Sequence, residues 1–349
     1  MKLTLRRDDV VLRQRVDAAH QRHDERIRLY LQLDHDGVVG YGEIAPQPLA
    51  LHGDPGVGEV IQELDGFVLS QLQAALEREG ALPSWTRIAR FAGSRASSAP
   101  AVTLVEMALL DRELRTQGRS IGELWPEHYD TPVQATASLL DDETEWILDP
   151  NVARLRVKSA PGELSETARA RLAALSVPVL LDFNCSASAV EEVSAQLASI
   201  RRYATVAAVE QPFAAGNVIE HARLASQIDV PVSLDEGVRT LRDLDQIVRY
   251  GAATMVCVKP ARVGGYANAR TIIARALEMG LVPYVGGFFE SPFARHVNAV
   301  LCRHLVREPS DIGPVMSGAS EPLDQVEGGF GWAPGGATLA RATVVASFG

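Results

Sequence analysis

Short apolar runs in the second part of the chain each end at a charged residue or a glycine, and the spacing between these ends is nearly constant. Amphipathic segments separate the runs, as in residues 190–200, where apolar residues recur at helical spacing. Short apolar runs that alternate with helices predict parallel strands in βαβ units. A repeat near 25 residues is that of one unit of a (β/α) barrel, so the ends should form a ring on one face. These ends, 24 to 28 residues apart, are Lys158, Asp182, Glu210, Asp235, Lys259 and Gly286.

The first part of the chain has a different pattern. Residues 26–33 alternate in polarity, residues 35–37 (HDG) predict a turn, and residues 38–44 continue as a second strand, so a β-hairpin is expected. Helical patterns follow at residues 57–76 and 99–117, with Gly118 as a candidate C-cap. An α+β region therefore precedes the predicted barrel.

Composition and charge exclude several classes of function. The chain has 349 residues, 46% of them hydrophobic and 22% charged, and its formal charge is −10. No segment approaches the roughly 18 apolar residues of a membrane span, and a negative chain without clustered cations is a poor partner for nucleic acid. Three widely spaced cysteines indicate neither a disulfide framework nor a thiolate zinc site. We therefore expect a cytoplasmic protein that binds neither membranes nor nucleic acid.

Three carboxylates occupy matched positions at the ends of consecutive predicted strands. The C-terminal strand ends of a barrel lie on the face where active sites are built, so Asp182, Glu210 and Asp235 should converge. Three carboxylates in one pocket repel one another unless a cation neutralises them, and an all-oxygen set selects a hard ion such as Mg²⁺. The alternative for any one of them is an acidic cap at the N-terminus of the next helix.

Two lysines flank the carboxylates, Lys158 on the strand before them and Lys259 on the strand after. On a closed barrel they would face each other across the metal site, where a nearby cation lowers the pKa of an ammonium group and frees the amine to act as a base. Taken singly, either lysine could instead pair with a neighbouring carboxylate. The whole set is suited to removing a proton α to a carboxylate and stabilising the enediolate. The predicted partner is a small-molecule carboxylate.

Six ordered motifs surround these residues. They are RVK (156–158), LDFN (181–184), VEQP (209–212), LDEG (234–237), VKPARVGGYANAR (258–270) and GGFFES (286–291). This set resembles the enolase superfamily, in its muconate-lactonizing-enzyme subgroup, and is similar to o-succinylbenzoate synthases and N-succinylamino acid racemases. The helix expected at residues 105–125 also resembles the segment that joins the family's capping domain to its barrel. The resemblance covers nearly the whole chain.

The resemblance implies an α/β fold with two domains. A modified TIM barrel, (β/α)7β, is expected at residues 121–317. An α+β capping domain is expected at residues 1–120, completed by the C-terminal tail from about residue 318 to residue 349. Members of the family tend to form oligomers, so the resemblance makes a homo-oligomer one candidate assembly, although the sequence does not give the oligomeric state.

The resemblance also implies roles for the ring residues. The three carboxylates become ligands of Mg²⁺, with Mn²⁺ as a candidate substitute, and the two lysines become the acid/base pair. Glu236 is then a neighbour of the metal site, and Asn184 is the asparagine of the family's DxN motif. Glu43, in the loop at residues 40–46, is expected either to reach the site from the cap or to be a solvated turn residue.

Some positions depart from the family pattern. Arg156 replaces the first lysine of the family's KxK motif, so only Lys158 carries over as a base. Arg156 still places a positive charge there, and this charge should lower the pKa of Lys158. Cys185 follows Asn184 in place of the family's usual residues. Neither His221 nor His296 lies at a predicted strand end, which argues against a histidine base.

The glycine pair Gly286 and Gly287 ends the seventh predicted strand. Small residues there would let backbone N–H groups approach a substrate carboxylate, or would simply form the turn into the next helix. The region at residues 308–314 has one aspartate rather than the DxD motif of dipeptide epimerases, which argues against that reaction.

We expect a Mg²⁺-dependent lyase that makes o-succinylbenzoate for menaquinone biosynthesis by dehydrating 2-succinyl-6-hydroxy-2,4-cyclohexadiene-1-carboxylate. Lys158 would be the base, and Lys259 would stabilise charge. The first alternative is racemisation of N-succinyl or other N-acylamino acids, with both lysines as bases. Racemisation and dehydration share the enolisation step, so the sequence separates them poorly. A muconate-type cycloisomerase is a second alternative. A non-catalytic metabolite-binding barrel would predict loss of a ring residue, and none is lost.

Overall fold

A computed structural model of the chain describes residues 1–18, 21–93, 98–125, 127–143, 145–146, 149–312 and 322–348. Residues 313–314 of the region tested for a DxD motif, and residues 318–321 of the predicted tail, lie outside the described residues.

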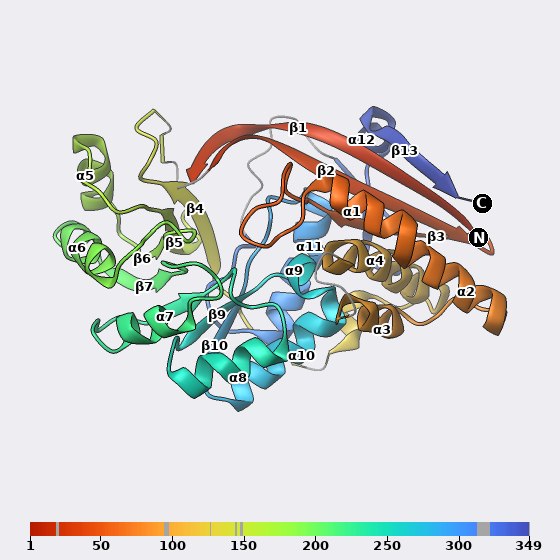
Figure 1. Cartoon of the computed structure of the whole chain (residues 1–349). Helices are drawn as coiled ribbons and strands as arrows, with labels where there is room; N and C mark the ends of the chain where they lie inside the picture. Colours follow the sequence, from red (N-terminus) through yellow and green to blue (C-terminus); the bar gives the residue numbers. More distant parts are fainter. Residues whose placement is uncertain are drawn as a thin grey trace.

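Alternating apolar residues build an antiparallel sheet from both ends of the chain. Its strands are β1 (Lys2–Ala18), β2 (Gln21–His35), β3 (Val38–Ile44) and β13 (Thr343–Phe348), in the order β13-β1-β2-β3. Asp36 and Gly37 both have positive φ and form the turn between β2 and β3, so the predicted hairpin is confirmed. Because β13 pairs with β1, the two chain ends lie side by side (Figure 1).

Helices pack against the apolar face of this sheet. α1 (Val57–Glu63), the π-helical η1 (Leu64–Val68) and α2 (Leu69–Glu79) continue one another, and α3 (Trp85–Ile88) and η2 (Ala89–Gly93) follow. α4 (Ala99–Thr116) is buried along most of its length against β3. Gly40 and Gly42 of β3 permit this contact, because a Cβ at either position would overlap a carbonyl oxygen of α4.

The second part of the chain forms a curved parallel sheet whose strands are paired in sequence order. Helices follow the strands from β5 onward and lie outside the sheet (Figure 1), so the predicted βαβ units are confirmed. The strands are β4 (Val133–Ser138), β5 (Val152–Lys158), β6 (Val179–Asp182), β7 (Val206–Glu210), β8 (Val232–Leu234), β9 (Met255–Val258) and β10 (Val282–Val285). The helices are α5 (Glu166–Ala173), α6 (Val190–Ile200), α7 (Val218–Ala225), α8 (Leu241–Tyr250), α9 (Pro260–Val263), α10 (Tyr266–Glu278) and α11 (Pro292–Leu305).

A short extended segment closes the sheet into a barrel. The amide of Gln134 on β4 donates to the carbonyl of Ser310 over 2.8 Å, and the Ser310 amide donates to Pro132 over 3.1 Å. On the other side, the Asp311 amide donates to Val285 of β10 over 2.9 Å. The eighth strand of the (β/α)7β barrel is thus reduced to Ser310 and Asp311, and the predicted fold class is confirmed.

The remaining elements are small. η4 (Ile121–Leu124) follows α4, and β11 (Leu323–Gln325), β12 (Trp332–Pro334) and α12 (Gly336–Arg341) precede β13. Within the described part of the chain, no helix is both long and apolar enough to cross a membrane. The three cysteines are free thiols.

Candidate active site

The predicted ring of strand ends lies at one mouth of the barrel. Lys158, Asp182 and Glu210 are the last residues of β5, β6 and β7, and they stand directly opposite one another in the parallel register. Asp235 and Lys259 follow the ends of β8 and β9 by one residue. Residues in register on neighbouring strands point to the same side of the sheet, and all five side chains are buried. The charged residues that recur about every 25 positions in the sequence therefore lie together as a ring in the structure.

The three carboxylates of the ring converge on a single cationic nitrogen. Arg156 lies two residues before Lys158 on β5, so both side chains point inward. Its Nη2 lies 2.7 Å from an oxygen of Asp182 and 3.1 Å from one of Asp235, and it also contacts Glu210. This nitrogen marks a point that three carboxylate oxygens surround.

The acidic cluster fits a hard divalent ion. Its three acidic side chains offer carboxylate oxygens as ligand atoms, and Mg²⁺ and Mn²⁺ prefer oxygen ligands. Burial raises the pKa of Glu210 even though Arg156 opposes the shift, because Asp182 and Asp235 add like charge beside it. Asp182 and Asp235 each have a second cationic partner, Lys158 and Lys259 respectively, whereas Glu210 pairs with Arg156, so Glu210 is the least compensated of the three carboxylates. If such an ion binds, Asp182, Glu210 and Asp235 are the residues that would hold it.

A thiol lies beside this cluster, which the sequence did not predict. The Sγ of Cys257, on β9, is within 4.8 Å of carboxylate oxygens of Glu210 and Asp235. Burial raises its pKa well above the ordinary range, and both carboxylates add to the shift, so the group is a protonated thiol.

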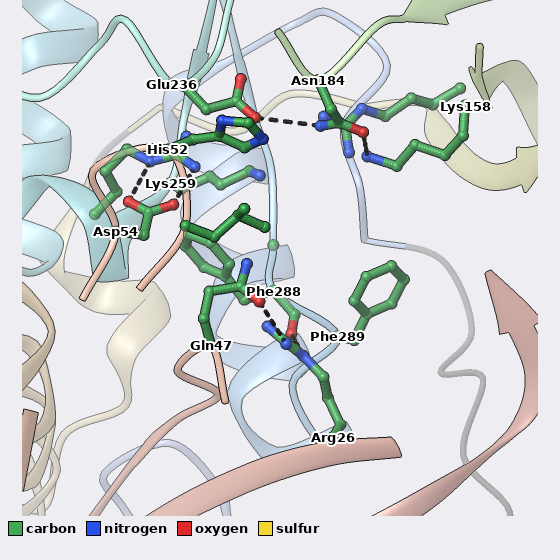
Figure 2. Close-up of a pocket in the computed structure, with 14 residues that line it drawn as sticks. Arg26, Gln47, His52, Asp54, Lys158, Asn184, Glu236, Lys259, Phe288 and Phe289 are labelled. Atoms are coloured by element: carbon green, nitrogen blue, oxygen red, sulfur yellow. Dashed lines mark hydrogen bonds and ion pairs between the residues drawn. The ribbon is translucent and has the colours of Figure 1, made fainter. Parts of the chain in front are cut away.

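The two lysines approach the carboxylates from opposite sides of the cluster. Lys158 Nζ is 2.5 Å from Asp182 and donates to the Asn184 side-chain oxygen over 2.8 Å. The Asn184 amide nitrogen in turn donates to Glu236 over 3.2 Å. Lys259 Nζ, reached from β9, is 2.9 Å from Asp235. Both predicted neighbours, Asn184 and Glu236, thus join the lysine on β5 to the loop after β8 (Figure 2).

Burial and charge shift the pKa values of the two lysines in opposite directions. Burial lowers the pKa of Lys158, and Arg156 lowers it further. Burial would also lower the pKa of Lys259, but the attraction of Asp235 outweighs it and leaves that pKa above its ordinary value. The surroundings therefore favour Lys158 as the amine that accepts a proton and Lys259 as a permanent cation.

A small cavity of about 50 Å³ opens between the ring and the cap (Figure 2). The barrel lines it with both lysines, Arg156 and residues of the strand-end loops, and the cap contributes residues of β2 and the loop after β3. Its lining residues are Arg26, Gln47, Leu51, His52, Asp54, Arg156, Lys158, Asn184, Glu236, Lys259, Arg262, Gly287, Phe288 and Phe289.

Arg26 joins the cap to the barrel at this cavity, a role that the sequence did not indicate. Its Nε donates to the Phe288 carbonyl over 2.8 Å, while its other nitrogens donate to Gln47 and to the Ala45 carbonyl, both over 3.0 Å. The side chain is 1% exposed. Arg26 thus ties the cap loop to the loop that follows β10.

A second connection runs through Arg262, which sequence reasoning also missed. Its Nε and Nη2 donate to the two carboxylate oxygens of Asp54 in the cap over 2.9 and 2.6 Å. Its Nη1 contacts Asp235 of the acidic cluster. Arg262 lies three residues after Lys259, on the single turn of α9. That proximity to a predicted active-site lysine is the only sequence signal that could have suggested its contacts with Asp54 and Asp235.

Glu43 lies away from the cavity. Its carboxylate accepts hydrogen bonds from the amides of Ser291 (2.6 Å) and Ala294 (3.2 Å) and from the Ser291 hydroxyl. Glu43 therefore caps the N-terminus of α11 from the cap, and it is not a solvated turn residue, because it is 2% exposed.

The glycine pair has two different environments. The Gly286 amide already donates to the Val258 carbonyl over 3.1 Å as part of the parallel ladder. A Cβ there would lie 2.5 Å from the sulfur of Cys257 and 2.9 Å from Lys259, so glycine gives these side chains their room. Gly287 lines the cavity. His221 and His296 do not line it.

Comparisons with known proteins agree with this architecture. Residues 145–320 match the family model described as enolase C-terminal domain-like. An N-succinylamino acid racemase from Amycolatopsis sp. is 30% identical over 221 residues, or 61% of this chain and 59% of the racemase. An o-succinylbenzoate synthase from Bacillus subtilis (strain 168) is 26% identical over 280 residues, or 77% of this chain and 72% of the synthase. The crystal structure of an N-succinyl Arg/Lys racemase from Bacillus cereus ATCC 14579 has a TM-score of 0.82 at 18% identity, covering 100% of this chain and 98% of that one.

Fold and site together define a capped (β/α) barrel with an acidic cluster between two lysines. The chain belongs to the enolase superfamily, in its muconate-lactonizing-enzyme subgroup, with relatives among o-succinylbenzoate synthases and N-succinylamino acid racemases. The crystal structure, at 18% identity, supports the fold alone. The alignment with the Amycolatopsis racemase spans about three fifths of that protein.

Proposed function

We propose that this chain removes a proton α to a substrate carboxylate with the help of Mg²⁺, and that its reaction is that of an o-succinylbenzoate synthase. The substrate would be 2-succinyl-6-hydroxy-2,4-cyclohexadiene-1-carboxylate, and the product, after loss of water, o-succinylbenzoate for menaquinone biosynthesis. One observation carries the proposal: Lys158 and Lys259 line the same cavity with an acidic cluster between them.

Residue usage adds weight to the two lysines. Of the 34 lysine and arginine residues, three are lysines, Lys2, Lys158 and Lys259. Arginine stays protonated in proteins and is a poor base, whereas a buried lysine shifts its pKa readily. A chain that uses arginine almost everywhere retains lysine at the two positions that face the cavity, where amine chemistry is useful.

The first step is proton removal by Lys158. Arg156 and burial lower the pKa of Lys158, so its amine can take the α-proton while the substrate carboxylate lies over the acidic cluster. A divalent ion bound by Asp182, Glu210 and Asp235 would supply positive charge that stabilises the enolised carboxylate. Asn184 holds Nζ of Lys158 within hydrogen-bond reach during this transfer.

The second step is departure of the hydroxyl group. The C–O bond breaks as the enediolate electrons form the new ring double bond, and Lys158, now an ammonium, returns its proton so that water leaves. Lys259 stays protonated beside Asp235 and stabilises negative charge on the opposite side without transferring a proton. Arg26 and Asp54 join the cap to the barrel beside the cavity, through Phe288 and Arg262, and this closure would limit access of water.

Racemisation of an N-acylamino acid is the second candidate. A specific observation favours it: two amines lie on opposite sides of the cluster, as a two-base exchange at one carbon requires. The 30% identity to an N-succinylamino acid racemase also supports it. In that reaction Lys259 would have to donate a proton in one direction and accept one in the other. Its raised pKa disfavours the direction in which it accepts a proton.

The purified protein should therefore be assayed with Mg²⁺ against both substrates. The cyclohexadiene carboxylate should be dehydrated, with loss of activity in EDTA. In parallel, N-succinylamino acids in D₂O report racemisation by deuterium uptake at the α-carbon. Turnover of muconate would instead favour a cycloisomerase, and no reaction or exchange with any of these would overturn the proposal in favour of a binding protein.

A further inference from the structure

We propose that Tyr284 is a positioning residue that holds Glu210 as a one-oxygen ligand, and that it thereby makes the acidic cluster selective for a small ion, Mg²⁺, over a larger one, Ca²⁺. The inference deepens the proposed function, because it takes the carboxylates as an ion site. It makes no use of the organic substrate.

The hydroxyl of Tyr284 commits one oxygen of Glu210. Tyr284 belongs to β10, reaches across the barrel interior, and donates its O–H to Glu210 Oε2. Ser233 Oγ, on β8, lies 2.9 Å from the same hydroxyl. An ionised carboxylate only accepts, so the Tyr284 proton points to Glu210 and Ser233 donates to the Tyr284 oxygen. All three side chains are fully buried.

The other oxygen of Glu210 faces the centre of the cluster. Oε1 contacts Nη2 of Arg156, the nitrogen that all three carboxylates surround. The two oxygens of Glu210 therefore have separate partners. Oε2 faces Tyr284 in the barrel interior, and Oε1 faces the point that the three carboxylates surround.

The ring of Tyr284 has little freedom to move. The guanidinium of Arg154 lies over it, 5.0 Å from the ring centroid. Arg154 is itself fixed, since its Nε donates to Gln134 over 2.6 Å and its Nη2 to the Pro309 carbonyl over 2.7 Å. The ring also packs in the small apolar cluster inside the barrel, which includes Ala208. The hydroxyl is thus aimed by a rigid frame.

This arrangement bears on ion size. Mg²⁺ requires nearly octahedral geometry at short distances and is held by one oxygen of each carboxylate, whereas Ca²⁺ accepts more ligands and bidentate carboxylates. With Oε2 bonded to Tyr284, Glu210 cannot turn both oxygens to the ion. Without the hydroxyl, Glu210 would be free to rotate and chelate with two oxygens, which suits Ca²⁺.

The test compares Mg²⁺ and Ca²⁺ binding by calorimetry in the wild type and in Tyr284→Phe, with no substrate present. Loss of an outer hydrogen bond to a ligand typically weakens metal affinity 10–100-fold, so we expect the Kd for Mg²⁺ to rise at least about 10-fold. The Kd for Ca²⁺ should change less, so that the preference for Mg²⁺ falls.

Tyr266→Phe is the matched control. It also removes a buried hydroxyl, which donates to Asn298 over 2.9 Å and touches none of the carboxylates. Its Kd values should equal those of the wild type. Ser233→Ala, which leaves the Tyr284 ring and O–H in place, should weaken Mg²⁺ binding in the same direction by a smaller factor, and it serves as the second variant if Tyr284→Phe does not fold.

An unchanged Kd for Mg²⁺ in Tyr284→Phe, or an equal weakening for both ions, would overturn the inference. So would a wild type that binds no Mg²⁺. A wild type that binds Mg²⁺ with the expected preference but turns over none of the proposed substrates would leave this inference standing and remove the proposed reaction alone.

Discussion

The guanidinium Nη2 of Arg156 lies 2.7 Å from the Asp182 carboxylate, at the point where the three acids of the ring meet. Arg156 stands at the first position of the KxK motif, where the family has lysine, and its side chain is longer and permanently charged. Arg156 therefore provides internal compensation for carboxylates that would otherwise repel one another in a buried site.

Replacing Arg156 by methionine should destabilise the metal-free protein. Removing one partner of a buried charge network typically lowers the free energy of unfolding by about 3–5 kcal/mol, and we expect this loss in EDTA. Mg²⁺ should restore more stability to Arg156→Met than to the wild type, because the ion would replace the one cation that all three carboxylates share. Urea unfolding with EDTA and with Mg²⁺ measures both.

The control for this change is Arg201→Met, which removes an arginine from an exposed ion pair with Asp229. It should alter the free energy of unfolding by less than about 1 kcal/mol. If Arg156→Met were as stable in EDTA as the wild type, the compensating role of Arg156 would be wrong.

Lys158→Met should slow proton removal strongly. A general base contributes roughly 10²–10⁴-fold to a rate, so kcat should fall within that range, and deuterium exchange at the substrate α-carbon should fall with it. Lys2→Met, the change at the third lysine, should leave both unchanged, since Lys2 lies exposed on β1. Exchange at the wild-type rate in Lys158→Met would assign the base elsewhere.

Asp54→Asn should loosen the cap. Asp54 makes two hydrogen bonds to the guanidinium of Arg262, and hydrogen bonds to charged groups contribute about 1.5–3 kcal/mol each. We expect a free energy of unfolding lower by an amount in that range and a raised KM, because the cap loop lines the cavity. Asp36→Asn, in the exposed turn between β2 and β3, is the matched change and should leave KM unaltered.

Stability should fall as pH rises toward 8, in part because of Glu106. This α4 residue accepts hydrogen bonds from the amides of Tyr266 and Ala267, the latter over 2.9 Å, yet burial raises its pKa to about 8. The folded state therefore holds a proton that the unfolded chain loses near its ordinary pKa of about 4.3. The contribution is full below that value and is lost by about pH 8, at close to 1.4 kcal/mol per pH unit between the two.

Glu106→Gln should remove this part of the slope. The free energy of unfolding between pH 6 and pH 8 should then fall less steeply than in the wild type by about that amount per pH unit. Glu77→Gln on the exposed side of α2 should not change the slope. Equal slopes in Glu106→Gln and the wild type would show that Glu106 is ionised in the folded protein.

The sequence by itself determined the barrel and the ring of its active site. Both follow from local, repeating patterns: a strand and a helix of fixed length return the chain to the same face every 25 or so residues, so charged residues at matched strand ends must meet. The hairpin and the two helices predicted after it also follow from local patterns, whereas the departure at Arg156 was seen through the resemblance to the family. The catalytic roles of the ring residues remain predictions.

Only the tertiary structure decided how distant segments complete the site. Arg26 meets Phe288 and Glu43 meets Ser291 across about 250 residues, and no periodicity links such pairs. Tyr284 looks like an ordinary strand residue until barrel closure sets it beneath Glu210. Sequence patterns report which face a residue occupies, whereas partners across a closed barrel are set by packing of the whole chain, where buried polar groups must find one another or lose the free energy of solvation.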